Sequence, residues 1–309
     1  MKLVELSGVT RSFASGRRAR VLAVDNVSFS INRGESVGLV GESGSGKSTL
    51  SRLICGLTPA EDGEIRLNGK PITAPSRAVQ MVFQSADEAL NPAFTIARNI
   101  AVGLGLSNAG ALPEVRSVAA KVGLPPELLP RLPHQLSGGQ QARAGIARAL
   151  IAQPELLLLD EPTAALDVSV QALVLRLIDR LRTETGCATL LVSHDLDVVR
   201  LMCTRVLVMY RGRIVEAGPV NQIIEAPRHP YTRLLVSATP GRNQGDRMTL
   251  PSTAPHADTE ACHFRDRCPM ATDICAQSRP KLDDMAPGHA VACHHSSSAA
   301  PQISGSGAC

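Results

Sequence analysis

The sequence predicts an α/β fold with a largely parallel sheet, and three observations support this class. Short β-type runs alternate with helical patterns from residue 1 to about 235, as in domains that pack helices on a parallel sheet. The run Leu156–Leu159 is apolar throughout, which is typical of a strand buried on both faces. The glycine-rich run Gly41–Thr49 follows one predicted strand and opens a helical pattern, so it predicts a strand–loop–helix unit.

The individual elements follow from these patterns in chain order. The strand candidates are short runs rich in Val, Leu and Met: Ser36–Val40, Ala78–Phe83, Leu156–Leu159, Thr189–Val192, Arg205–Met209 and Arg213–Glu216. The helix candidates are Lys47–Cys55, Pro113–Val122, Gly138–Ile151, Val168–Thr185 and Leu196–Met202. Arg211-Gly212 favours a hairpin turn between the last two strands. Between Leu90 and Pro133 the β signal fades, and Ala, Leu, Gly and Pro predict a mainly helical insertion.

The composition changes after residue 235 and divides the chain. Ser, Thr, Pro, Gly and Asn dominate from Ser237 to Glu260, which predicts a linker over 236–258. A cysteine-containing segment follows, and we expect a small module over 259–296. The low-complexity run after Cys293 predicts a disordered tail over 297–309.

Charge and hydropathy exclude some classes of function. The chain has five Phe, two Tyr and no Trp, which argues against a stacking platform for single-stranded nucleic acid. A net charge of +4 without a basic stripe also gives no reason to expect a nucleic-acid partner. No window approaches about 18 uninterrupted apolar residues, and residues 1–10 contain no signal core. We therefore expect the chain on the cytoplasmic side, where any membrane role needs a partner that spans the bilayer.

The run Gly41–Thr49 fits the phosphate-binding pattern G-x-x-x-x-G-K-[ST]. Glycines allow the backbone to wrap closely around an anion, and the helix N-terminus adds partial positive charge. Lys47 is expected to reach the β- and γ-phosphates from a loop rather than from the core, and Ser48 to bind Mg²⁺ through its hydroxyl. The nucleotide-binding residues expected here are Gly41, Ser43, Gly44, Ser45, Gly46, Lys47, Ser48 and Thr49.

Two acidic residues come directly after the apolar run Leu156–Leu159. In open α/β sheets ligands bind at the carboxyl ends of the strands, so Asp160 is expected to contact Mg²⁺. Glu161 is placed to accept a proton from an attacking water. Taken alone, Asp-Glu-Pro also reads as the start of a helix, but its combination with Gly41–Thr49 favours the catalytic interpretation.

The run Leu136-Ser-Gly-Gly-Gln140 distinguishes the chain from other proteins with these two motifs. With it, residues 3 to 240 resemble the ATP-binding-cassette (ABC) ATPases. The resemblance implies a RecA-like core with an antiparallel β subdomain and a helical subdomain over about 88–152, within a nucleotide-binding domain over 1–235. It further implies that two cassettes sandwich two ATP molecules head to tail. Ser137, Gly138, Gly139 and Gln140 would then contact the nucleotide of the partner subunit.

The same resemblance implies roles for four further residues. Gln84 corresponds to the glutamine that senses Mg²⁺ and the attacking water, and His194 to the histidine that contacts the γ-phosphate. Asp167, in Ala164-Ala-Leu-Asp167, would bridge the two subunits. Phe13 resembles the aromatic residue that stacks on adenine, although an ordinary core phenylalanine is the alternative.

Further stretches resemble the ATPase subunits of the oligopeptide, dipeptide and nickel uptake group. They are Asn91-Pro92, Asp167–Gln171, Pro227–Thr232, Cys262–Pro269 and Val291–His294. The resemblance implies an ATPase on the cytoplasmic face of the plasma membrane that energises uptake of peptides or related solutes. Its expected partners are two transmembrane permeases, a second ATPase in a heterodimer and, indirectly, an extracytoplasmic solute-binding protein. The alternative is a soluble ABC-type ATPase of DNA repair or translation, but this chain has one cassette and no coiled-coil insertion.

Cys262, Cys268, Cys275 and Cys293 form the remaining motif. Their spacing lacks the tight C-x₂₋₄-C pair of most structural zinc sites. Zinc, disulfides and free thiols nevertheless stay open from the residues alone, with His263, His289 and His294 as possible further ligands. Relatives with these cysteines are thought to carry a 4Fe–4S cluster, so the resemblance implies one here.

Overall fold

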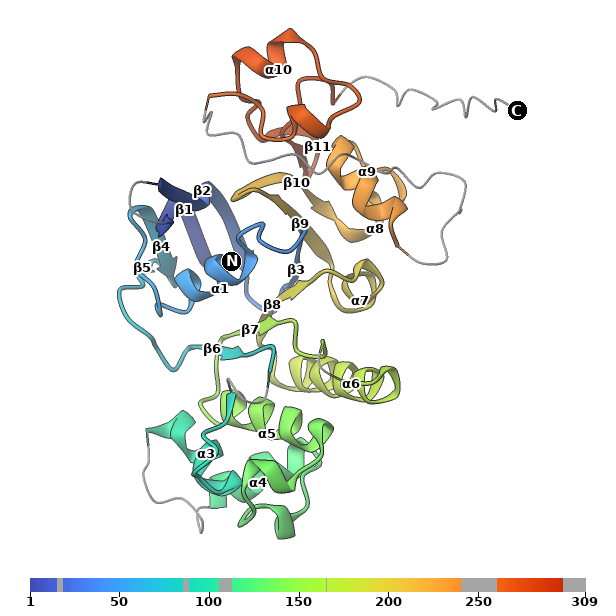
Figure 1. Ribbon diagram of the computed structural model, residues 1–309. Helices are drawn as coiled ribbons and strands as arrows, with labels where there is room; N and C mark the ends of the chain where they lie inside the picture. Colours follow the sequence, from blue (N-terminus) through green and yellow to red (C-terminus); the bar gives the residue numbers. More distant parts are fainter. Residues whose placement is uncertain (16–18, 86–88, 106–112, 165, 240–259, 297–309) are drawn as a thin grey trace, which may run out of the picture.

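The computed structural model describes residues 1–15, 19–85, 89–105, 113–164, 166–239 and 260–296 of the chain. It contains a four-stranded and an eight-stranded sheet. The helices α3, α4 and α5 gather at one end of the molecule, and the C-terminal segment forms a module at the other end (Figure 1). The residues predicted as a tail, 297–309, and most of the predicted linker, 240–258, lie outside the described residues.

The four-stranded sheet is antiparallel and has the order β2-β1-β4-β5. Its strands are β1 (Lys2–Ser15), β2 (Ala19–Asn32), β4 (Asp62–Leu67) and β5 (Lys70–Pro71). Alternation of apolar and polar residues in β1 buries Val4 and Leu6 on one face, as expected of a sheet with one covered face. This sheet agrees with the antiparallel subdomain that the family resemblance implies.

The eight-stranded sheet has the order β11-β12-β10-β9-β3-β8-β7-β6. Strands β6, β7, β8, β3 and β9 are mutually parallel, whereas β10, β11 and β12 pair antiparallel. Their bounds are β3 Ser36–Val40, β6 Val79–Val82, β7 Leu156–Asp160, β8 Ala188–Ser193, β9 Arg205–Tyr210, β10 Arg213–Pro219, β11 Asp283–Ala286 and β12 His289–Val291. Every predicted strand is therefore confirmed to within two or three residues.

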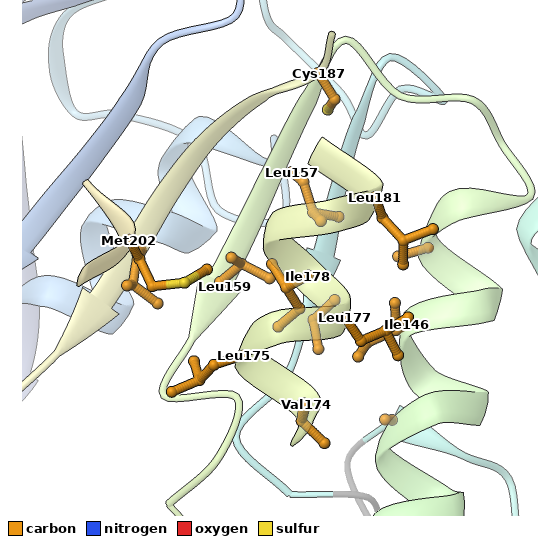
Figure 2. Close-up of a cluster of buried hydrophobic side chains, with 14 of the residues drawn as sticks. Ile146, Leu157, Leu159, Val174, Leu175, Leu177, Ile178, Leu181, Cys187 and Met202 are labelled. Carbon is orange, nitrogen blue, oxygen red and sulfur yellow. The ribbon is translucent and has the colours of Figure 1, made fainter. Parts of the chain in front are cut away.

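The predicted helices are confirmed as well: α1 (Lys47–Ile54), α4 (Pro113–Lys121), α5 (Gly138–Leu150), α6 (Val168–Thr185) and α7 (Leu196–Met202). The insertion also contains α3 (Ile96–Ala101) and the 3₁₀ turns η1 (Val102–Leu104), η2 (Pro126–Leu128) and η3 (Pro133–Gln135). Figure 2 shows how α6 packs between β7 and α5, with Leu157 and Leu159 facing Ile178 and with Leu177 beside Ile146. This apolar packing fixes the carboxyl end of β7, where the acidic residues lie.

The C-terminal module consists of η5 (Arg265–Arg267), α10 (Asp273–Gln277), β11 and β12, and it continues the large sheet through pairing of β12 with β10. The Glu216 side chain of β10 is fully buried; its carboxylate accepts backbone bonds from Arg228 and His229 and lies 2.8 Å from Nε2 of His289. His229 caps α9 (Pro230–Ser237), which follows α8 (Val220–Glu225). A segment too poor in apolar residues for its own core thus docks on the core of the larger domain.

Candidate nucleotide-binding site

The predicted phosphate loop joins β3 to α1, as the sequence indicates. Gly46 has a φ of 106° and closes the loop directly before α1. A Cβ at this position would lie 2.1 Å from the carbonyl oxygen of Ala23, so both the conformation and the space require glycine. Helix α1 buries Leu50, Leu53 and Ile54 against β2 and β7, and this packing fixes its N-terminus at the edge of the sheet.

Lys47 is more buried than expected. It is the first residue of α1 and only 6% exposed, so the expectation that it lies in a loop rather than in the core is wrong. Its Nζ donates to the carbonyl oxygens of Gly41 (2.8 Å) and Glu42 (2.9 Å). Burial lowers its pKa, while Glu161, Asp160 and Glu42 oppose the shift. The ammonium group therefore lies inside the curve of the loop, close to acidic groups at the ends of the strands.

Ser48 and Asp160 form the candidate Mg²⁺ site. The Ser48 hydroxyl donates to Oδ1 of Asp160 at 3.2 Å, and Asp160 is the last residue of β7 and 7% exposed. Burial raises the pKa of this carboxyl, and the Ser48 hydrogen bond opposes the shift. A hydroxyl and a carboxylate are hard oxygen donors of the kind that Mg²⁺ prefers beside a phosphate, so the pair fits the expected ion.

Glu161 lies at the centre of three strand ends. Its carboxylate Oε2 is 3.4 Å from Nε2 of Gln84, after β6, and 3.3 Å from Nδ1 of His194, after β8. Glu161 itself has a φ of 44°, a left-handed conformation that is costly for a residue with a Cβ and that clusters at functional sites. The three predicted catalytic residues therefore meet at one edge of the sheet.

The residues Ser137–Gln140 lie elsewhere in the chain's fold. Ser137 caps α5: its hydroxyl accepts from the amide of Gln140 (3.4 Å), and Oε1 of Gln140 accepts from the amide of Ser137 (2.9 Å). Figure 1 shows α5 well apart from α1. The start of α5 is therefore exposed and lies away from this chain's own phosphate loop. The predicted role toward the nucleotide of a second cassette requires such a position.

Asp167 and Phe13 are both accessible. Asp167 caps α6 by accepting from the amide of Val170 at 3.0 Å, and its neighbour Ala165 lies outside the described residues. Phe13, in β1, is 42% exposed, and the Arg11 guanidinium lies 5.1 Å from its ring centroid. The alternative of an ordinary core phenylalanine is therefore wrong, whereas the adenine-stacking role stays a prediction.

Two residues that contact the loop were not singled out by the motifs. The hydroxyl of Tyr231 accepts from the amide of Glu42 at 2.7 Å, and the guanidinium of Arg267 binds the Glu42 carboxylate. Tyr231 lies within Pro227–Thr232 and Arg267 within Cys262–Pro269. In the sequence, both stretches stand out only because they resemble the ATPases of the peptide uptake group. Nothing in either stretch indicated contact with a loop about 190 to 225 residues earlier in the chain.

Comparison with known proteins identifies the family of the chain. Residues 24–164 match the ABC transporter family, and residues 215–275 match the C-terminal region of oligopeptide/dipeptide transporters. A putative peptide import ATP-binding protein of Brucella ovis is 40% identical, over 94% of this chain and 97% of its own length. The oligopeptide transport ATP-binding protein OppF of Salmonella typhimurium is 43% identical over 88% of this chain and 87% of its own length.

The structural comparison gives the same result. A dimeric ATP-binding cassette in a post-hydrolysis state, bound to ADP and phosphate, superposes with a TM-score of 0.63 and 30% identity. The match covers 71% of this chain and 99% of that cassette. The chain therefore belongs to the ATP-binding subunits of ABC transporters, in the group that carries the oligopeptide/dipeptide transporter C-terminal region.

Proposed function

We propose that this chain is the ATP-hydrolysing subunit that energises uptake of peptides or related solutes through partner membrane permeases. The observation that carries the proposal is that Gln84, Glu161 and His194 meet at one edge of the sheet. Lys47 and Asp160 lie beside them, and the same chain contains the transporter-type C-terminal region. Relatives that match over 94% and 88% of this chain are named as peptide import or oligopeptide transport ATP-binding proteins.

Hydrolysis follows from the positions of the side chains. The loop amides and Lys47 bind the β- and γ-phosphates, and Ser48 and Asp160 would hold Mg²⁺, which supplies charge neutralisation when bound. Glu161 accepts the proton of the attacking water, because its carboxylate lies at the strand ends beside Gln84 and His194. Gln84 and His194, which contact Glu161, orient that carboxylate and the water.

A second cassette completes the proposed site. Ser137 and the first amides of α5 are exposed, and a helix N-terminus binds anions readily. Near Asp167, helix α6 exposes Val168 (82%) and Leu173 (54%), and apolar side chains beside a polar cap favour a protein partner. We propose that this partner is a sister ATPase, with Ser137 of each cassette reaching the nucleotide of the other.

The permeases are proposed to dock near the glutamine at the end of β6. A cavity of about 200 Å³ lies between this segment and α5, lined by Phe83, Gln84, Ala142 and Leu166 among others. Within the described ranges, no helix combines the length and the apolar character needed to cross a bilayer. Docking at this groove would place a permease segment next to Gln84, which contacts the catalytic carboxylate, and would hold the chain at the cytoplasmic face of the plasma membrane.

The four cysteines of the module are proposed to bind a 4Fe–4S cluster. All four are free thiols, and they lie close enough for Cys275 to raise the pKa of Cys262, Cys268 and Cys293. Among the described residues, no group of three or more His, Cys, Asp or Glu is arranged around a single metal ion. Cys262, Cys268, Cys275 and Cys293 would supply the four thiolates that are the usual ligands of such a cluster. Its proposed role is structural, since ordering this module requires more than its small core.

Reconstitution tests the proposed function. The chain is combined in vesicles with two permeases, a second ATPase and a solute-binding protein of the oligopeptide transport type, and ATP-dependent accumulation of labelled di- and oligopeptides is measured. We expect labelled peptides to accumulate with the unmodified chain and not with Lys47→Ala. A stable ATP-hydrolysing complex that shows no affinity for permeases would instead support the soluble ATPase of repair or translation.

A further inference from the structure

Three groups of Glu42, the second residue of the phosphate loop, are each bound by another residue of the chain: its amide, its carbonyl and its carboxylate. Its amide donates to the hydroxyl of Tyr231 at 2.7 Å. Its carbonyl oxygen accepts from Nζ of Lys47 at 2.9 Å. Its two carboxylate oxygens accept from Nη1 and Nη2 of Arg267, both at 2.9 Å. The last contact comes from the C-terminal module and joins residues 225 positions apart.

Arg267 is held in a rigid setting. Its side chain is 16% exposed, and its guanidinium lies 5.8 Å from the ring centroid of Tyr210 and 5.9 Å from that of Phe264. These two rings contact each other edge to face at 5.2 Å, and Tyr231 packs on both. The aromatic group therefore connects η5 of the module with β9 and α9 and orients the guanidinium toward the loop.

We infer that Arg267 is a positioning residue for ATP binding, through which the C-terminal module sets the shape and charge of the phosphate loop. The inference rests on the proposed ATP site. A two-bond contact between guanidinium and carboxylate fixes direction as well as distance, so Glu42 and the following amides are pre-ordered before nucleotide arrives. Ordering of this kind reduces the entropy cost of binding.

The negative charge of Glu42 is the second reason to expect that Arg267 affects ATP binding. The Glu42 carboxylate belongs to a loop that binds a triphosphate, and an unpaired negative charge there opposes binding. Arg267 neutralises it from the side of the module. Without Arg267 the loop loses both its order and this neutralisation, so the proposed consequence is weaker ATP binding. The chemical step should change little, because Glu161 and His194 lie after β7 and β8 and do not contact Arg267 in any described interaction.

A simple structural contact between module and cassette is the competing interpretation. Such a contact would contribute to the stability of the folded chain but not to ATP affinity. The two interpretations separate in a double-mutant cycle on the full chain with Arg267→Gln, Glu42→Gln and the double variant. The measured quantities are the Kd of MgATP by calorimetry, the melting temperature without nucleotide, and KM and kcat in the assembled transporter.

We expect Arg267→Gln to raise Kd and KM about tenfold, the order of magnitude of one lost hydrogen bond to a charged group, and to leave kcat within about twofold. Glu42→Gln removes the repulsive carboxylate, so the double variant should bind ATP like Glu42→Gln alone. Arg267→Lys keeps the charge but not the paired geometry, and an intermediate Kd is expected. Arg265→Gln is the matched control: this arginine of the same short helix pairs with Asp266 inside the module, and its Kd should not change.

Three results would overturn the inference. One is a lower melting temperature for Arg267→Gln with an unchanged Kd, and another is simple additivity in the double variant. If Arg267→Gln does not fold, Arg267→Lys still decides, and the third result is an unchanged Kd in that variant. An unmodified chain that binds no MgATP would contradict the proposed function itself, whereas an unmodified chain that binds and an insensitive Arg267→Gln contradict only the present inference.

Discussion

Nδ1 of His194 lies 3.3 Å from the carboxylate of Glu161, and this contact joins the ends of two neighbouring parallel strands, β8 and β7. His194 is 68% exposed at its side chain, whereas the Glu161 side chain is 20% exposed. The inner residue of the pair is therefore the one suited to act as base, and the outer residue is free to turn toward a phosphate. This arrangement supports different roles for the two residues, and mutation separates them.

Glu161→Gln should leave ATP binding intact and lower hydrolysis by roughly 10²–10⁴, the usual contribution of a positioned general base. The amide keeps the size and the contact with Gln84 but cannot accept the proton of the water. Turnover is measured in the assembled transporter, because the composite site needs a second cassette. Glu155→Gln, directly before β7 and paired with Arg33 at the surface, is the matched control and should hydrolyse normally. Near-parental turnover of Glu161→Gln would remove Glu161 from this role.

Lys47→Ala should lower ATP affinity at least about 100-fold, because two charge-assisted contacts with phosphate are lost. The fold should persist, since α1 keeps its apolar face and only the bonds to the carbonyls of Gly41 and Glu42 disappear. Calorimetry with MgATP and a melting curve check both statements. Lys70→Ala, at an exposed position in β5, serves as the control. Unchanged affinity in Lys47→Ala would contradict the phosphate-loop assignment.

Much of this site could be predicted because its signals are local. Strands β6, β7 and β8 are short and mostly apolar, and Gln84, Glu161 and His194 follow their carboxyl ends within two residues. Parallel pairing brings these ends together without further information. Glu161, His194 and Gln84 thus meet as the motifs indicate.

The remainder depends on contacts that no local pattern encodes. β1 and β2 are each 14 residues long with one exposed face, so their apolar content is diluted, and only the family resemblance implied their sheet. The burial of Lys47 follows from loop carbonyls that fold over it. The pairing of β12 with β10 and the contact of Arg267 with Glu42 join segments far apart in sequence, and short motifs carry no information about such pairs.

The stability of the chain should fall with acid in a way that depends on His229. Burial lowers the pKa of this histidine to about 3, and Arg233 acts in the same direction, whereas an unfolded histidine titrates near about 6.5. At a pH between these two pKa values, the histidine binds a proton in the unfolded chain but not in the folded chain. The free energy of unfolding is therefore greatest above about pH 6.5 and decreases below it by about 1.4 kcal/mol per pH unit from this group.

His229→Asn tests this dependence, because asparagine can also cap α9 but does not titrate. Nδ1 of His229 accepts from the amide of Tyr231 at 3.0 Å, and the asparagine oxygen can take over this bond. Urea unfolding from pH 6.5 to 5 should show a decline that is smaller by about 2 kcal/mol in the variant. His134→Asn, at an exposed position in η3, should keep the parental slope. Equal slopes for His229→Asn and the parent would contradict the prediction.

Anaerobically purified chain should be brown, with broad absorption near about 400 nm and about four irons per chain. The physical reason is the crowding of the four thiols: the pKa of Cys268 is raised to about 11, mainly by burial, and the other three cysteines act in the same direction. Positive iron would relieve the repulsion between the thiolates and order a module with few apolar residues of its own. Cys268→Ser should lose iron, and Cys203→Ala, which changes a buried cysteine between α7 and β9, should retain it. Zinc in place of iron would favour the zinc alternative, and colourless protein with neither metal would leave the free thiols as the explanation.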